Sequence, residues 1–109
     1  MMNIKDEGIN EVKKIAELIK SRFDIDQIIL FGSYANGNPD KNSDLDICVV
    51  MDTKDERKIN ILYEMDKSLY SKTFFPVDLI LFKREEFLQN KDNKATLHYQ
   101  VGHNGMKIA

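Results

Sequence analysis

Three short runs of apolar residues constrain the fold of this 109-residue chain most strongly. The first run is wholly apolar and has strand length, which is typical of a strand buried on both faces of a sheet, and the second run also predicts a strand. The third run is rich in aromatic and branched residues, and its proline predicts an edge strand or the start of a strand. The predicted strands are 28–31, 45–51 and 74–82, with Pro76 in the last.

Helical patterns separate these runs. Residues 7–22 carry apolar side chains at spacings of three and four, which predicts an amphipathic helix. Thr53 stands three residues before Glu56, as in a capping box, and predicts a second helix that runs to about Tyr70. This order predicts an α+β (α/β-like) domain with a small mixed β-sheet flanked by helices, whose strand order the pattern leaves open. The remaining predicted elements are a helical turn at 33–36, helices at 83–88 and 92–101, and a short strand at 105–109.

Length and composition predict a single domain, 1–109, that buries about 65% of the surface of its unfolded chain. The net charge of −2 with interspersed signs offers no basic face, so direct nucleic-acid binding is not expected. No apolar stretch approaches the roughly 20 residues that a membrane span needs. The single cysteine, Cys48, lies inside an apolar run, which excludes a disulfide framework and favours a buried side chain in a cytoplasmic protein.

The loop at 32–43 and the strand after it carry the candidate chemistry. Gly32 follows a buried strand and lets the backbone turn sharply, while amides of the next helical turn and the Ser33 hydroxyl can receive phosphate oxygens. Asp44 and Asp46 are two residues apart, so both side chains leave one face of the strand. Two converging carboxylates repel each other unless a cation lies between them, which predicts Mg²⁺ held together with substrate phosphates.

A third acid, Asp78, interrupts the apolar run 77–82. A lone carboxylate in such a strand is costly without a partner, and a neighbouring strand would place it beside Asp44 and Asp46. The alternative is that Asp78 faces solvent on a half-exposed sheet. A glycine-serine turn or an Asp-x-Asp pair alone is commonly structural, so the interpretation depends on their combination.

The combination resembles the signature of the polymerase-beta-type nucleotidyltransferase superfamily, carried here by Gly32-Ser33, Gly37 and Ser43-Asp44-Leu45-Asp46. The short length resembles the minimal nucleotidyltransferases of that superfamily, often called MNT domains. Asp78 takes the position of the family's third acid, and residues 101–109 resemble its terminal strand.

The resemblance implies transfer of a nucleoside monophosphate, AMP from ATP, to a hydroxyl, with pyrophosphate leaving. By the same resemblance, Gly32 and Ser33 would bind the β- and γ-phosphates, and Asp44, Asp46 and Asp78 would bind two Mg²⁺ ions. Asp78 would bind the ion nearer the incoming hydroxyl and help to deprotonate it.

The resemblance also implies a partner. Larger relatives carry a helical domain that holds the acceptor, and none is expected after residue 109. Minimal members are commonly paired with a helical HEPN-domain toxin, and some silence it by adding AMP to a tyrosine. The leading hypothesis is therefore an antitoxin-type protein adenylyltransferase. The alternatives are an antitoxin that acts by binding alone, and a small-molecule nucleotidyltransferase that works as a homodimer.

Other conspicuous residues have ordinary structural interpretations. His98 and His103 lack cysteine or acid partners at zinc-ligand spacing. Tyr34 either lines the nucleotide pocket or packs against the first helix. Lys41 either reaches a phosphate or is solvated. A place in the core or an interface is expected for three aromatic residues, Tyr63, Tyr70 and Phe74.

Overall fold

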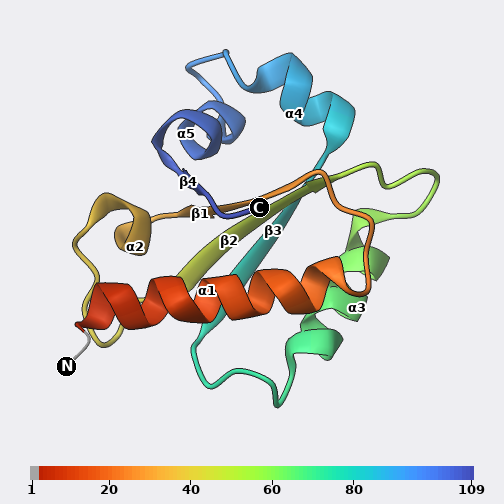
Figure 1. Cartoon of the computed structure of the whole chain (residues 1–109). Helices are drawn as coiled ribbons and strands as arrows, with labels where there is room; N and C mark the ends of the chain where they lie inside the picture. The colour runs from red at the N-terminus through yellow and green to blue at the C-terminus, as the bar shows by residue number, and fades with distance from the viewer. Residues whose placement is uncertain (1–2) are drawn as a thin grey trace.

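The computed structural model describes residues 3–109 and contains a four-stranded mixed sheet with order β3-β2-β1-β4. Helices α1 and α3 lie on one side of the sheet and α4 and α5 on the other (Figure 1). The predicted α+β class is confirmed. The elements are α1 (Ile4–Lys20), β1 (Gln27–Phe31), α2 (Ser33–Asn36), β2 (Leu45–Met51), α3 (Lys58–Leu69), β3 (Val77–Lys83), α4 (Arg84–Asn90), α5 (Leu97–Asn104) and β4 (Met106–Lys107).

Strand β2 is central and joins the two halves of the sheet. It pairs antiparallel with β1 and parallel with β3, and β1 pairs antiparallel with the short β4. The parallel pair needs a crossover connection, which α3 supplies. The strand order that the sequence pattern left open is thus fixed by one hairpin-like pair and one crossover.

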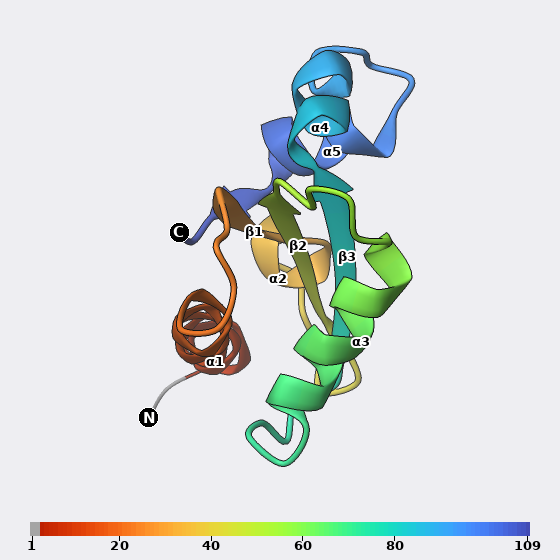
Figure 2. The same cartoon turned by 90° about the vertical axis from the view of Figure 1, so that its right-hand side faces the viewer.

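Both faces of β2 are buried. Odd-numbered residues such as Ile47 and Val49 pack with α1 and α3, and even-numbered residues such as Cys48 and Val50 pack with α4 and α5. In the view turned by 90°, α1 is seen end-on on one side of the sheet, with α4 and α5 grouped together on the other (Figure 2). We call the second side the α4–α5 face. The expected burial of Cys48 is confirmed.

The predicted capping box at Thr53 is wrong. Helix α3 begins at Lys58, and its N-cap residue makes no side-chain capping bond. Residues 53–56 form a turn instead, because the Asp52 carboxylate accepts the backbone N–H of Lys54 (2.9 Å) and Lys54 takes a left-handed conformation with φ 54°. This local bond replaces the first helical turn, and it leaves Thr53 buried.

The third strand begins at Val77, later than the predicted residue 74. Pro76 lies just before the strand, and β3 is at the sheet edge, so both expectations drawn from this proline hold. Phe74 is 100% exposed and Tyr70 is 82% exposed, which excludes both from the core. Tyr63 is exposed as well, so an interface is the remaining expectation for these aromatics.

Capping side chains explain two other differences in the helix bounds. The Asn3 side chain accepts the N–H of Asp6 (2.8 Å), so α1 begins earlier than predicted. The Thr96 hydroxyl accepts the N–H of Tyr99 (3.1 Å), so α5 begins at Leu97 rather than at residue 92. Across residues 3–109, no helix has both the length and the apolar character of a membrane span.

Gly105 lets the end of α5 lie directly against β1. A Cβ atom at this position would overlap the Val101 carbonyl oxygen and the Ile29 side chain, and would lie 3.1 Å from the Leu30 carbonyl oxygen. Two of these atoms belong to the backbone and cannot move aside cheaply. The absence of a side chain at Gly105 therefore sets the separation between α5 and the sheet.

We expect Gly105→Ala to lower the free energy of unfolding by about 1–3 kcal/mol, the usual cost of overpacking. Gly102→Ala is the matched control, because its Cβ would meet only the Phe87 ring at 3.2 Å and alanine favours a helix interior by up to about 1 kcal/mol. Urea denaturation of both variants tests the expectation. Equal effects of the two substitutions would contradict the close packing at Gly105.

Candidate active site

Asp46 lies at the centre of a row of residues that crosses the sheet. Its Cα pairs with Phe31 on β1 and with Asp78 on β3. Gly32 directly follows Phe31, so the row brings the glycine-serine turn and the third acid to the two sides of Asp46. We call Gly32, Asp46 and Asp78 the acid row.

The side chains of the acid row lie at one end of the α4–α5 face. Asp46 shares this face with Cys48 and Val50, and Asp78 shares it with Ile80 and Phe82. Asp46 is half-buried, whereas Asp44 and Asp78 are exposed. The predicted desolvation cost at Asp78 is therefore wrong, because this acid is only the second residue of its strand. Asp46 is the acid that carries a desolvation cost.

A network of backbone bonds holds Asp44 in place just before β2. The Asp40 carboxylate accepts the N–H of Asn42 (2.8 Å), and the Ser43 hydroxyl accepts the N–H of Asp40 (2.9 Å). The N–H of Leu45 donates to the carbonyl of Pro76 (2.8 Å) and ties the start of β2 to the start of β3. Ser43 thus serves the turn that presents Asp44.

Gly32 permits a close approach between the backbone and the Asp46 carboxylate. It has φ 77° and ψ −154°, and a Cβ atom here would lie 3.0 Å from Asp46 Cγ and overlap one carboxylate oxygen. Its carbonyl accepts the N–H groups of Ala35 (3.1 Å) and Asn36 (3.0 Å), which starts α2 at Ser33. The first amides of a helix have no carbonyl partner within it, so Ser33 presents donors beside the acids.

The acids repel one another in the ligand-free protein. Burial raises the pKa of Asp46, and the charges of Asp78 and then Asp44 raise it further. Within residues 3–109, no side chain forms a hydrogen bond or ion pair with any of the three carboxylates. A cation beside Asp46 would relieve this repulsion.

The acids do not form a closed metal site by themselves. In the described part of the chain, no three His, Cys, Asp or Glu side chains converge closely enough to hold an ion. Hard oxygen ligands that leave positions free nevertheless fit Mg²⁺, which binds proteins through one or two carboxylates and takes its other ligands from phosphate and water. Asp44 and Asp46 could hold such an ion, and Asp78 lies next to Asp46 on the edge strand β3.

The remaining candidates have structural roles. Tyr34 is buried against Gly8 of α1, which settles its two alternatives in favour of packing, and burial raises its pKa. Burial raises the pKa of Cys48 to about 12, so its thiol is a poor nucleophile. His98 stacks on Phe82, and His103 contacts Asp92 at 3.2 Å. Lys41 is exposed.

Sequence reasoning missed a small cavity beside Gly32. Its volume is about 130 Å³, and we call it the amide pocket because three of its lining side chains are amides. Two of these come from α5, more than sixty residues away in the sequence, so no local motif marks them. The pocket is lined by Phe31, Gly32, Asn36, Gln100, Val101 and Asn104.

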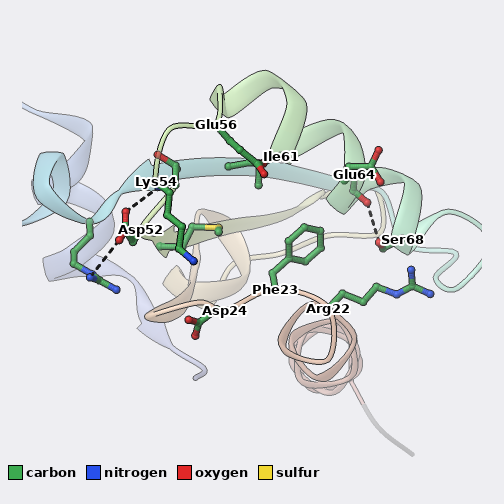
Figure 3. Close-up of a pocket in the computed structure, with 12 residues that line it drawn as sticks. Arg22, Phe23, Asp24, Asp52, Lys54, Glu56, Ile61, Glu64 and Ser68 are labelled. Carbon is green, nitrogen blue, oxygen red and sulfur yellow. Dashed lines mark hydrogen bonds and ion pairs between the residues drawn. The ribbon is translucent and has the colours of Figure 1, made fainter.

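The largest cavity, about 640 Å³, lies at the other end of β2 (Figure 3). It includes Met51, about 17 Å along the strand from Asp46 at the usual rise per residue. Phe23 and Ile61 line its interior, and apart from Ser68 its other labelled residues are a mixture of cations and carboxylates. The cavity contains no member of the acid row, so its size does not identify the candidate site.

The raised pKa of Asp46 gives a signed pH prediction for the metal-free protein. A carboxyl group whose pKa is higher in the folded state contributes most to stability below its ordinary value of 3.8, and this contribution is lost as the pH rises through the folded value. We therefore expect Asp46→Asn to be more stable than the parent at pH 7, with the gain vanishing near pH 3. Urea denaturation across this range measures it.

Asp26→Asn is the control of opposite sign. The Arg84 guanidinium donates two hydrogen bonds to Asp26 (2.6 and 2.7 Å) and lowers its pKa, so this carboxylate stabilises the protein above pH 3.8. Its replacement should lower stability at pH 7. If both variants lost stability at pH 7, the repulsion at Asp46 would be excluded.

Comparison with known proteins identifies the family. The nucleotidyltransferase domain family matches residues 12–100. Protein MJ1379 of Methanocaldococcus jannaschii, whose name proposes a protein adenylyltransferase, is 32% identical over 79 residues, which cover 69% of this chain and 79% of the relative.

Solved structures agree with this match. A protein of Sulfolobus solfataricus, proposed to be a nucleotidyltransferase, has a TM-score of 0.64 and 26% identity over 81% of this chain and 78% of its own. A toxin-antitoxin structure with AMP-PNP has a TM-score of 0.65 and 29% identity over 92% of this chain and 73% of its own. The protein is therefore a member of the nucleotidyltransferase domain family.

Proposed function

We propose that this protein transfers AMP from ATP to a hydroxyl group of a partner protein. The observation that carries the proposal is the acid row, in which a glycine turn and two strands bring Gly32, Asp46 and Asp78 side by side. Support also comes from the relative named for protein adenylyltransferase activity and from the toxin-antitoxin structure with an ATP analogue.

Each member of the site has a distinct task in this reaction. Gly32 and Ser33 would bind the β- and γ-phosphates through backbone N–H groups and the serine hydroxyl. Asp44 and Asp46 would hold Mg²⁺ against the phosphates, and Asp78 would orient the incoming hydroxyl. When bound, Mg²⁺ supplies neutralisation of the phosphate charge and stabilises the attacking and leaving oxygens.

In the proposed reaction, one bond to the α-phosphorus forms and another breaks. The acceptor oxygen attacks the α-phosphorus and forms the new P–O bond, while the bond from this phosphorus to the bridging oxygen breaks and pyrophosphate leaves. Asp78 accepts the hydroxyl proton, a task that its exposed position at the sheet edge suits. Asp46 is less suited to this task, because it is half-buried at the centre of the acid row.

Exposed aromatic residues support a protein as the acceptor. The loop 70–75, which we call the aromatic loop, exposes Tyr70 and Phe74 and leads directly into β3, where Asp78 is the second residue. A cavity of about 420 Å³ lies along this loop. Exposed apolar patches commonly mark protein-protein contacts. We therefore infer that the partner contacts the aromatic loop while its hydroxyl reaches Asp78.

The partner that we propose is a helical toxin of the HEPN type, with a tyrosine as acceptor and this protein as its antitoxin. Two similar structures are of a toxin-antitoxin pair, MntA-HpeT. Solved variants of that pair replace two aspartates two positions apart with glutamate, or a tyrosine with alanine. Our proposal likewise uses two aspartates two positions apart, Asp44 and Asp46, on this chain, and a tyrosine as the acceptor.

The direct test is transfer of label from α-labelled ATP to the candidate partner in the presence of Mg²⁺. We expect Asp44→Asn with Asp46→Asn to reduce transfer at least about 100-fold, as losses of electrostatic stabilisation do. Chelation of divalent metal should abolish it. Asp55→Asn, an exposed acid outside the site, is the control and should transfer normally. Tight complex formation without any transfer by the parent would favour an antitoxin that acts by binding alone.

A second test addresses the docking surface. We expect Tyr70→Ser with Phe74→Ser to weaken partner binding at least about tenfold, because exposed aromatics that become buried commonly dominate an interface. Leu88→Ser removes an exposed apolar side chain from α4 and is the matched control. Calorimetric titration of each variant with the partner measures the effect. Equal weakening by both changes would mean that the aromatic loop is not the contact.

A further inference from the structure

We propose that the partner presents its acceptor hydroxyl on an extended segment, which pairs antiparallel with the free edge of β3 and lengthens the sheet by one strand. The proposal rests on the proposed function and specifies how the partner is recognised, namely through backbone hydrogen bonds beside Asp78 in addition to the aromatic loop. Three observations carry it: the unpaired backbone groups of β3, the apolar middle of this strand, and its position next to the acid row.

Strand β3 forms one edge of the sheet, so alternate backbone groups face away from β2 (Figure 1). The N–H of Leu45 donates to the carbonyl of Pro76 (2.8 Å), which directs the backbone groups of even-numbered β3 residues toward β2 and those of odd-numbered residues outward. Within residues 3–109, no group accepts the N–H of Leu79 or Leu81, although Leu81 is almost fully buried. Backbone N–H groups at buried residues are rarely left unpaired, so this edge is suited to receive a further strand.

The free edge ends where α4 begins. The N–H of Lys83 donates to the Glu86 side chain (2.9 Å), a bond that starts α4. An added strand can therefore pair only with the residues before Lys83. Asp78 is exposed and Leu79 is half-buried, whereas Leu81 is buried. The most accessible part of the edge is thus the part nearest the acid row.

The middle of β3 lacks the features that keep edge strands from pairing. Natural edge strands are usually short, or carry lysine, other charges, proline or a bulge. Strand β3 has seven residues, and the four residues between Asp78 and Lys83 are all apolar. Pro76 lies before the strand, where it removes no N–H from the edge. An edge of this kind pairs readily with an extended segment of another protein.

The edge lies where the acceptor has to arrive. Asp78 directs its own backbone groups toward β2, so in an antiparallel addition it forms a non-hydrogen-bonded pair with the residue opposite it. Side chains are closest in such pairs, with Cα atoms about 4.5 Å apart, and both leave the same face of the sheet. A hydroxyl-bearing side chain opposite Asp78 therefore emerges beside the acid row. The added segment then continues past Val77, which lines the cavity along the aromatic loop.

A second copy of this chain is a less suitable occupant of the edge. In a symmetric antiparallel pair of β3 strands, opposite residues share a face, so Asp78 would lie opposite an even-numbered residue of the other copy. Within β3 these residues are Asp78 itself, Ile80 and Phe82. The first brings two like charges together, and the other two place the carboxylate against an apolar side chain. The edge is therefore better suited to a partner than to self-association.

Backbone hydrogen exchange, resolved by residue with NMR, tests the pairing in the free protein and in its complex with the candidate toxin. In the free protein we expect the N–H groups of Leu79 and Leu81 to exchange faster than those of Ile80 and Phe82, which face β2. In the complex we expect exchange at Leu79 and Leu81 to slow at least about tenfold, because each N–H gains a hydrogen bond. Unchanged exchange in a complex that transfers label would overturn the proposal.

Leu79→Pro tests the same edge by partner binding. Proline here removes an outward N–H, a position at which edge strands tolerate it, so the bonds between β3 and β2 remain. We expect partner affinity to fall at least about tenfold, while binding of ATP with Mg²⁺, measured by calorimetry without the partner, changes less than about twofold. Leu79→Ala is the matched control, because it shortens the same side chain but keeps the N–H, and it should bind the partner nearly as the parent does. If the proline variant does not fold, the exchange measurement decides.

The outcomes separate the edge from the proposed function. If the parent transfers no label to the toxin, the proposed function itself is wrong and the edge pairing falls with it. If the parent transfers label and Leu79→Pro binds the toxin as tightly as Leu79→Ala does, only the edge pairing is wrong. If the free protein elutes as a dimer in which Leu79 and Leu81 are already protected from exchange, a second copy occupies the edge, which also overturns the proposal.

Discussion

Parallel pairing between β2 and β3 fixes the position of the acids in the candidate site. It places Asp46 opposite Asp78, and the bond from Leu45 N–H to the Pro76 carbonyl sets this register at the strand ends. A slip of one residue would turn every side chain of a strand to the other face. Residues such as Ile47 are fully buried under α1 and α3, so a slip would move Asp46 into the core. Hydrophobic packing therefore determines the geometry of the polar site.

The same packing supports an arrangement that is unfavourable by itself. Asp46 loses hydration and faces two other carboxylates, without a cation or donor among the described side chains. Such local destabilisation persists only where the surrounding structure over-determines it. Here the support comes from two apolar layers, one on each face of β2. A ligand that brings cations to Asp46 would recover part of this free energy on binding, so repulsion in the free protein favours the loaded state.

The sequence predicts most of the fold, because apolar runs and helical spacing reflect burial that is local to each element. It fails where a single side-chain bond redirects the backbone, as at Asp52, whose carboxylate holds a turn where a capping box predicts a helix. In the site, the motif places Gly32 and Asp46 together because only one loop separates them. Asp78 required a strand order that no pattern supplies. Gln100 was beyond prediction, since its place beside Gly32 depends on how α5 packs on β1.

The two ends of the acid row have different surroundings, and this difference bears on the kind of acceptor that the proposed site suits. At the β1 end, α2 and α5 form walls around Gly32 and the amide pocket. At the β3 end, the described sheet stops, and the aromatic loop that precedes β3 exposes Tyr70 and Phe74. On the proposed function, a triphosphate would therefore find most of its contacts on this chain, whereas an acceptor hydroxyl at Asp78 would find few. On the proposed function, the acceptor must bring its own surface, which makes a folded protein a better acceptor than a small molecule.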